Sequence, residues 1–383
     1  MRSPLLALAF LLASAGVARA QPELVYFGTH TVTAAQVPAG QPVPDQGIYG
    51  AWFDPDSGHF TALGRVADIA APTWLAADPK HPRLYSVTSG DAGSDNLIAL
   101  SADPKTGALS VLNRTASGGG DATYLALDPR SHALFSANYA TGQVSAVPVA
   151  PDGRLGAMAS IQSDSGTGPG PRQTAPHAHA AVPDPSGRYV LVPDLGADRV
   201  FVYRFDAATR QLSPAATPFE TLPPGTGPRH LVFHPNGKLA FLVSELSAEV
   251  RSYRWNARTG QLQVLQTVSL LSPGFTGKKS GGEIAISADG RFVYASSRGE
   301  NTIVVYAVDA KTGQLTEIQR APSQGNSPWS FAFDPSGRWF LVADEASSLI
   351  AAFRVDTRSG QLTPSAETLS VPRPVTVTFL THP

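Results

Sequence analysis

Thr259-Gly260-Gln261-Leu262 is a short turn signal that returns as Thr312-Gly313-Gln314-Leu315 and Ser359-Gly360-Gln361-Leu362. Four looser copies precede these three, and all seven place Gly or a polar residue just ahead of Leu or Phe. The looser copies are Ser57-Gly58-His59-Phe60, Thr106-Gly107-Ala108-Leu109, Asp152-Gly153-Arg154-Leu155 and Thr209-Arg210-Gln211-Leu212. A repeat of about 50 residues in a strand-rich sequence is typical of propeller blades.

A second turn signal, of Asp-Pro-x-Gly type, alternates with the first. Pro presets φ for such a turn and Gly accepts a positive φ, so two strands are expected to meet there. Clear copies begin at Asp184, His234 and Asp334, and looser copies begin at Asp78, Asp128 and Ser287. Runs of β-branched and aromatic residues flank these turns, at 189–192, 200–205, 292–295 and 302–308. The pattern predicts four strands in each repeat.

The Asp-Pro turn occurs six times and the Thr-Gly turn seven times, and the two ends of the chain explain the difference. Residues 24–28 resemble a strand that follows a missing Asp-Pro turn, and residues 372–379 resemble the strand that precedes it. The sequence therefore predicts an all-β, seven-bladed β-propeller closed by pairing of its N- and C-terminal strands. Two β-sandwiches would leave the continuous repeat unexplained. Residues 21–383 are expected to form this single domain.

The first twenty residues have the character of a secretory signal peptide. Arg2 supplies a positive start, residues 5–17 are largely apolar, and Ala18-Arg19-Ala20 is a cleavage signature. The alternative is an ordinary buried N-terminal segment. Cleavage would leave a chain that begins at Gln21, and the expected location is periplasmic or secreted.

The composition excludes several classes of function. Charged residues are 15% of the chain and the net charge is −1, so neither a nucleic-acid partner nor a membrane partner is predicted. There is no Cys, which excludes disulfides and thiol chemistry. We expect a monomer that acts on a small molecule.

Most of the reactive side chains fall on one face of the predicted propeller, where each first strand begins and each second strand ends. Loops on a rigid scaffold often carry function, and clustered charges in a charge-poor chain indicate an anion-binding or acid–base site. At the equivalent places of other blades the chain has uncharged aromatic residues: Trp74, Tyr139 and Trp329. The candidates are His177, His179, Asp194, Arg229, His230, Glu245, Glu283 and Arg298.

Each candidate also has a purely structural interpretation. His177 or His179 alone can hydrogen-bond a neighbouring loop. Together they are spaced to chelate a metal on an extended strand, but no third ligand follows at a characteristic spacing, so neither a metal nor another cofactor is predicted. The Gly-rich run at 117–120 lacks the Lys and helix of a phosphate loop. No partner is predicted for His30, His59, His81, His132 or His382.

The charged candidates can pair within one blade. Arg229 and Glu245 fall at the ends of adjacent strands, and a buried ion pair between them would only stabilise the blade. Arg298 and Glu283 are expected to have the same opportunity in the next blade.

Several of these segments together resemble a known family. They are Pro176-His177-Ala178-His179, residues 192–200, residues 227–235 and Ser297-Arg298-Gly299. In them the chain resembles the seven-bladed β-propeller lactonases, which include bacterial 6-phosphogluconolactonase and, more distantly, fungal carboxy-cis,cis-muconate cyclase. The resemblance covers essentially all of the chain after residue 20. It implies catalytic roles for His177, Arg229, Glu245 and Arg298, and substrate-binding roles for His179, Asp194, His230 and Glu283.

The chain also departs from the pattern of that family. Ser244 and Ser297 stand where the family usually has Asn, and residues 327–330 replace a Pro-Arg-His type of motif, which removes a cation. Sugar-phosphate metabolism is cytoplasmic, whereas this chain carries an export signal. Whether the substrate is phosphorylated is therefore left open.

The expected activity is hydrolysis of a sugar-type lactone by an activated water. His177 or Glu245 would be the base, with Arg229 and Arg298 stabilising the oxyanion or binding an anionic group of the substrate. There are two alternatives. A lactone-forming cycloisomerase would use the same groups in reverse, and a non-enzymatic exported propeller that binds a protein or ligand would not require this set of residues.

Overall fold

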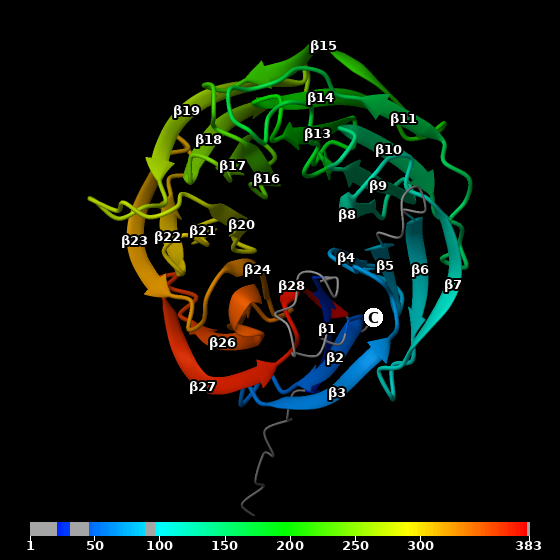
Figure 1. Ribbon diagram of the computed structural model, residues 1–383, viewed down its shortest axis with the longest axis vertical. Coiled ribbons are helices and arrows are strands. Elements are labelled where there is room, and N and C mark those ends of the chain that lie inside the picture. The colour runs from blue at the N-terminus through cyan, green and yellow to red at the C-terminus, as the bar shows by residue number, and fades with distance from the viewer. Residues whose placement is uncertain (1–20, 31–45, 89–95, 381–383) are drawn as a thin grey trace, which may run out of the picture.

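Seven four-stranded antiparallel sheets surround a central axis in the computed structural model, which describes residues 21–30, 46–88 and 96–380 (Figure 1). This confirms the all-β, seven-bladed propeller. The proposed signal peptide, residues 1–20, and His382 lie outside the described residues. Within the described ranges, no helix has the length and apolar character of a membrane span.

The blades follow one another along the chain, and the strands of each blade run in order from the innermost outward. The first complete blade is β4 (Leu75–Ala77), β5 (Arg83–Thr88), β6 (Asn96–Ala102) and β7 (Leu109–Ala116). The next is β8 (Ala122–Asp128), β9 (Ala133–Asn138), β10 (Gln143–Pro148) and β11 (Ser160–Ser163). Then come β12 (Val182–Pro183), β13 (Tyr189–Asp194), β14 (Arg199–Asp206) and β15 (Gln211–Thr221).

The remaining blades repeat this order. They are β16 (Pro228–Phe233), β17 (Leu239–Ser244), β18 (Glu249–Asn256) and β19 (Gln261–Ser269), then β20 (Gly281–Ile286), β21 (Phe292–Ser297), β22 (Thr302–Val308) and β23 (Leu315–Pro322). The last is β24 (Pro328–Phe333), β25 (Trp339–Asp344), β26 (Leu349–Val355) and β27 (Leu362–Ser370), with a 3-10 turn, η2 (Glu345–Ser347).

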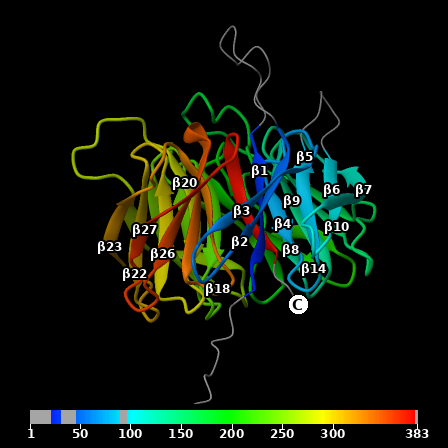
Figure 2. The ribbon, with the colours of Figure 1, turned by 90° about the horizontal axis from the view of Figure 1, so that it is seen from below.

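The closing blade takes strands from both ends of the chain, as predicted. Its order is β28 (Pro374–Leu380), β1 (Glu23–Thr29), β2 (Ile48–Phe53) and β3 (Phe60–Ala67). Strand β28 pairs antiparallel with β1, with Leu24 opposite Leu380 and Phe27 opposite Val377. Both ribbon views show the two strands side by side (Figures 1 and 2). Pairing of β1 with β28 covers a strand edge that would otherwise be open to another chain.

Hydrophobic packing between neighbouring blades holds the ring together. Each of the seven buried clusters combines residues of two adjacent blades; one, for example, joins Phe241 and Val250 to Val293 and Val304. The second strands, such as β17, β21 and β25, are buried along their whole length because sheets cover them on both faces. Outer strands such as β19 are largely exposed or half-buried.

The repeated turns form as the sequence predicts. In the Thr-Gly turn that begins at Asp309, the Asp309 carboxylate accepts hydrogen bonds from the N–H groups of Lys311 (2.8 Å) and Thr312 (3.2 Å), and Gly313 has φ +78°. The fourth copy places Arg210 at the same position with φ 58°. A non-Gly residue in this region pays a steric cost, so this copy is the strained one.

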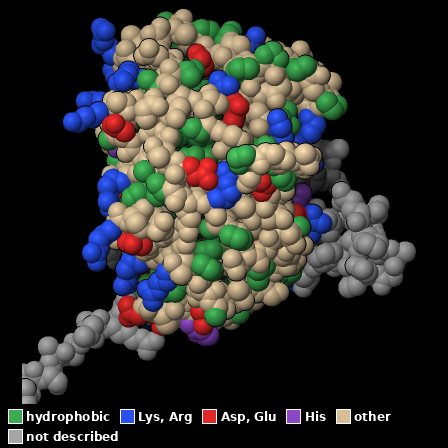
Figure 3. Space-filling model, turned by 90° about the vertical axis from the view of Figure 1, so that its left-hand side faces the viewer, with side chains coloured by type: hydrophobic (Ala, Val, Ile, Leu, Met, Phe, Trp, Pro, Cys, Tyr) green, Lys and Arg blue, Asp and Glu red, His purple; other side chains and the backbone are tan. Residues whose placement is uncertain are grey.

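The Asp-Pro hairpins lie at the same end of the blades as the Thr-Gly turns and carry structural arginines. Arg188 donates through NH2 to the Ala257 carbonyl (2.6 Å), and Arg291 donates through NH2 to the Thr357 carbonyl (2.6 Å). Each contact joins one blade to the next. In the side view, many Lys and Arg side chains gather at the left of the picture, on one of the two ends of the propeller (Figure 3).

Candidate active site

Three first strands, β8, β16 and β24, each place one side chain at the mouth of the central channel through a β-bulge. Strand β16 pairs with β17 through Pro228 and then His230, so Arg229 between them is left out of the ladder. The same irregularity leaves out Thr123 in β8 and Trp329 in β24. A bulge redirects its extra side chain, and all three extra residues line one cavity.

A second position lies just after each second strand. The N–H of Glu245 donates to the Gly227 carbonyl (2.7 Å), and the N–H of Arg298 donates to the Ser280 carbonyl (2.7 Å) in the next blade. Tyr139 makes the equivalent contact after β9. The Glu245, Arg298 and Tyr139 side chains also line the cavity, so the blades of β8 and β16 each deliver two residues, one from each position, to one place.

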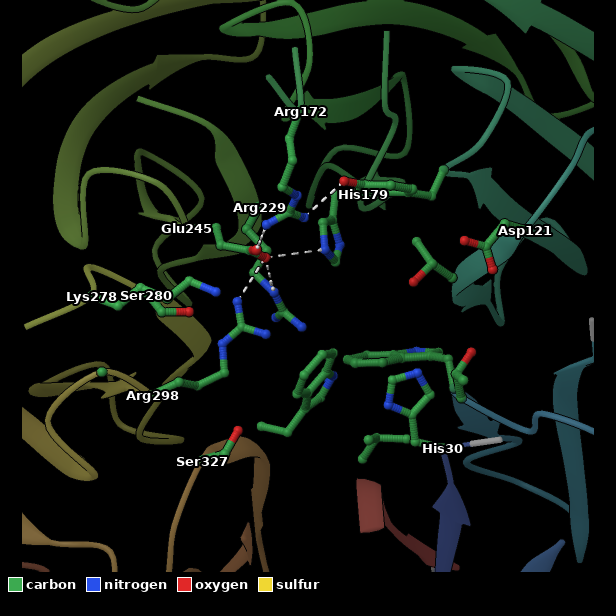
Figure 4. A pocket seen from close by; sticks show the side chains of 17 residues that line it. His30, Asp121, Arg172, His179, Arg229, Glu245, Lys278, Ser280, Arg298 and Ser327 are labelled. Atoms are coloured by element: carbon green, nitrogen blue, oxygen red, sulfur yellow. Dashed lines mark hydrogen bonds and ion pairs between the residues drawn. The ribbon is translucent and has the colours of Figure 1, made fainter. Parts of the chain in front are cut away.

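The cavity measures about 600 Å³ and has an excess of positive charge. Its cationic residues are Arg172, Arg229, Lys278 and Arg298, whereas its acidic residues are Asp121 and Glu245. Figure 4 shows the three guanidinium groups and His179 directed toward the Glu245 carboxylate. Such a cavity favours an anion, or a transition state in which negative charge develops.

The centre of the site is the buried Glu245 carboxylate. Its Oε2 lies 2.7 Å from Arg298 NH2, 3.3 Å from Arg229 Nε and 3.7 Å from His179 Nε2. Its Oε1 accepts a hydrogen bond from Arg172 NH1 at 2.5 Å. Four residues from three segments of the chain, the loop before β12 and the β16 and β20 blades, therefore meet at one side chain.

The surrounding charges keep Glu245 ionised. Burial alone would raise the pKa of its carboxyl group, but the charges of Arg298 and Arg229 outweigh burial and hold that pKa below its usual range. Burial, together with the charge of Arg298, lowers the pKa of Arg229 to about 10. Both groups are thus charged at neutral pH, and the guanidinium groups are only partly neutralised.

His179 is the neutral member of the group. Burial, followed by the charges of Arg229 and His230, depresses its pKa well below the ordinary value. The side chain is 8% exposed, and its Nδ1 has no hydrogen-bond partner among the described residues. A neutral imidazole beside a fixed carboxylate is able to accept a proton from water.

Behind the cavity lies a second buried pair, His230 and Glu283. His230 Nδ1 lies 2.8 Å from Glu283 Oε1, and Arg229 NH1 lies 3.1 Å from the same His230 nitrogen. Neither His230 nor Glu283 lines the cavity. The ion pair expected between Arg298 and Glu283 is not formed, because Arg298 reaches across the blade boundary to Glu245 instead.

His177 and Asp194 lie beside the cavity rather than in its wall. The His177 ring stacks on the Tyr139 ring (centroids 4.5 Å apart, 14°), and its Nδ1 lies 2.7 Å from the Tyr139 carbonyl oxygen. Asp194 Oδ1 accepts hydrogen bonds from the N–H groups of His177 and Ala197, both at 2.8 Å. Of the two histidines in this motif, only His179 reaches the cavity. The described residues include no group of three metal-ligating side chains.

Sequence reasoning missed several lining residues, and the charged or titratable ones are Arg172, Lys278, Asp121 and His30. Arg172 and Lys278 lie in long loops that precede β12 and β20, where no repeat marks them. His30 follows β1 at the position equivalent to Glu245, since its N–H donates to the Arg373 carbonyl at 2.9 Å. An alignment of the seven repeats on their second strands would have found His30.

The chain matches a protein-family model described as "Lactonase, 7-bladed beta-propeller" over residues 25–379. It belongs to this lactonase family. The chain is 32% identical to the 6-phosphogluconolactonase of Bacillus subtilis (strain 168) over 355 residues, which are 93% of this chain and 97% of that protein.

Solved structures of similar proteins share the whole propeller. One is described as the periplasmic gluconolactonase of Pseudomonas aeruginosa; it is 34% identical, with a TM-score of 0.86 over 94% of this chain and all (100%) of that chain. A protein from Lactobacillus plantarum is 32% identical, with a TM-score of 0.85 over the same shares of the two chains. The lactonase fold is therefore common to all three along nearly their full length.

Proposed function

We propose that this protein hydrolyses a non-phosphorylated, sugar-type lactone in the cavity at the propeller mouth. The observation that carries the proposal is the Glu245 carboxylate in contact with three guanidinium groups and a neutral histidine. Membership of the lactonase family supports the reaction class. The similarity to a periplasmic gluconolactonase supports a neutral sugar, as does Trp329 at the bulge position that holds Arg229 in another blade.

Arg229 and Arg298 would stabilise the oxyanion. Arg229 NH1 donates to the Gly282 carbonyl (2.9 Å) and Arg298 Nε donates to the Gly281 carbonyl (3.1 Å), so both guanidinium planes are held before substrate arrives. Each guanidinium has five N–H donors, and these contacts with those to Glu245 leave donors for the lactone carbonyl oxygen. Preorganised donors of this kind lower the barrier most where negative charge develops.

His179 would accept the proton of the attacking water. A water above the 3.7 Å gap between His179 Nε2 and Glu245 Oε2 would contact both atoms. As the water oxygen bonds to the carbonyl carbon, its proton passes to His179, and the Glu245 carboxylate stabilises the imidazolium. Collapse of the tetrahedral intermediate breaks the bond to the ring oxygen, which takes the proton from His179. The product is the open hydroxy acid.

Kinetics on purified protein test this assignment. We expect His179→Gln to lower kcat on D-glucono-1,5-lactone by about 10²–10⁴-fold, the usual contribution of a general base. His177→Gln is the matched control, because its ring lies outside the cavity wall, and it should lose less than about tenfold. Equal losses in both variants would contradict the role of His179. A protein that hydrolyses neither this lactone nor its 6-phosphate would instead favour a non-enzymatic binding propeller.

We also propose that the protein is exported after cleavage behind Ala20. The support is the sequence of residues 1–20. N-terminal sequencing of the protein from its native host should find Gln21 first, in the periplasm or medium. An intact N-terminus at Met1 in the cytoplasm would overturn this proposal.

A further inference from the structure

The cavity extends well beyond the charged group around Glu245. Figure 4 shows Asp121 and His30 across the cavity from Glu245. Trp74 lines it from the blade between those that carry Asp121 and His30. A monosaccharide lactone has only about 12 non-hydrogen atoms, whereas cavities of several hundred Å³ bury ligands of drug size. A lactone held at Glu245 therefore leaves this second half unfilled.

Two indole rings make the second half suitable for a sugar. Trp329 lies with its ring under the Arg298 guanidinium (4.4 Å from the centroid) and 5.5 Å from the His30 ring, so it connects the charged half to the other side. Trp329 belongs to the β24–β27 blade, between the blade that carries Arg298 and the closing blade that carries His30. Its position makes it a wall shared by both halves of the cavity.

Trp74 is the second indole, and it is held rigidly. Its ring packs at a tilt against the Tyr124 ring (centroids 4.5 Å apart, 30°), and its Nε1–H donates to the Leu125 carbonyl at 3.0 Å. The hydroxyl groups of Thr73 and Thr123 line the same part of the cavity. A rigid aromatic surface packs against the C–H face of a sugar ring, and neighbouring hydroxyl groups bond its hydroxyls.

We propose that Trp74 and Trp329 form a second subsite, which binds the non-reducing sugar of a disaccharide-derived aldonolactone linked through O4. This inference rests on the proposed lactonase function and names its substrate class. In a six-membered 1,5-lactone, the carbonyl carbon and C4 lie at opposite corners of the ring. When the carbonyl oxygen faces Arg229 and Arg298, the group on O4 points away from them, toward the aromatic half.

Kinetics on two lactones test the subsite. The wild-type protein should have a kcat/KM about tenfold higher on lactobiono-1,5-lactone than on D-glucono-1,5-lactone, the effect of about one good aromatic contact. Trp74→Leu should abolish this preference by lowering kcat/KM on the disaccharide lactone about tenfold more than on the monosaccharide lactone, whatever smaller loss follows from its contact with His230. Trp329→Leu should also abolish it, whereas Trp329→Phe should restore it. Trp52→Leu, outside the cavity, is the control and should keep the preference.

Two results would overturn the subsite: no preference in the wild-type protein, or a Trp74→Leu variant that retains it. Failure of the lactonase function itself is distinguishable, because binding needs no turnover. If no lactone is hydrolysed, calorimetry with lactobionate and gluconate decides. Binding of lactobionate about tenfold tighter, lost in Trp74→Leu, supports the subsite, and equal binding of both acids overturns it.

Discussion

The blades β16–β19 and β24–β27 carry a glutamate at the same place but surround it differently. The N–H of Glu245 donates to the Gly227 carbonyl (2.7 Å), and the N–H of Glu345 donates to the Ser327 carbonyl (3.0 Å). Both side chains are buried, each with 7% of its surface exposed. Glu245 and Glu345 therefore occupy equivalent backbone positions in their blades.

The partners of the two carboxylates differ. Glu245 meets three guanidinium groups and His179, whereas Glu345 pairs with Arg373 alone among the described arginines and lies 3.5 Å from His30. The bulge residue of the first blade is Arg229, and that of the second is Trp329. The comparison shows that the propeller fold sets where each glutamate lies. The side chains of neighbouring blades and loops then decide which charged partners it has.

Neutralising each glutamate is the strongest test of this difference. Glu245→Gln leaves buried Arg229 without its counter-charge, so we expect a loss of about 3–5 kcal/mol in the free energy of unfolding and a fall in kcat/KM of at least about 10²-fold. Glu345→Gln should cost about 1–2 kcal/mol, because the Arg373 side chain is 36% exposed and water can solvate it. Urea denaturation and lactone kinetics measure both variants. Equal losses of activity would mean that the two sites are equivalent.

Changing the bulge residue tests the guanidinium itself. Arg229→Lys keeps the charge but loses the planar fork that contacts Glu245 and the Gly282 carbonyl, so kcat should fall by about 10²-fold. In the other blade, Arg373→Lys serves as control and should leave kcat within about threefold. Full activity in Arg229→Lys would show that only the charge matters.

The residue before each glutamate differs between the two blades: Ser244 precedes Glu245, and Asp344 precedes Glu345. Only Asp344 can titrate, so we expect it to make the stability of the fold depend on pH. Burial raises the pKa of the Asp344 carboxyl to about 7. The folded state then holds this proton more tightly than the unfolded chain, whose Asp pKa is about 4, so stability falls as pH rises from about 4 to about 7.

Asp344→Asn removes this titration, and Asn138 already occupies the equivalent position in strand β9. We expect the variant to gain stability over the wild-type protein between pH 4 and pH 7, by up to about 4 kcal/mol, and to keep a constant gain above pH 7. Unfolding at pH 5 and pH 8 measures the gain. Glu23, whose pKa burial also raises to about 7, contributes equally to both proteins. A gain that does not change with pH would contradict the buried Asp344 carboxyl.

The smallest expected effect on stability concerns the Thr-Gly turns between the third and fourth strands of the blades. The Thr-Gly turn of β18–β19 has Gly260 at φ +72°, whereas the turn of β14–β15 has Arg210 at φ 58°. Arg210→Gly should stabilise the fold by about 0.5–1 kcal/mol through relief of strain, reduced by the greater freedom of Gly in the unfolded chain. Thermal unfolding detects the change, and a lower midpoint would show that the Arg210 side chain contributes more than the strain costs.

Much of the fold and part of the site followed from local signals. The strand predicted at 302–308 is β22, and the split closing blade forms as predicted. Of the eight candidate residues, Arg229, Glu245, Arg298 and His179 line the cavity; His230 and Glu283 lie behind it; His177 and Asp194 lie beside it. Arg172 was not predicted, because its loop has no repeat partner and only folding brings it to Glu245.

The sequence by itself determined the number of blades, the closure of the ring and the face that carries the reactive residues. The turn residues and the strand pattern act within each repeat of about 50 residues, so they can be recognised from the sequence alone. Only the tertiary structure decided that Arg298 pairs with Glu245 and that His179, not His177, enters the cavity. Those contacts join separate blades, and they depend on which side chains meet once packing between blades has set the ring.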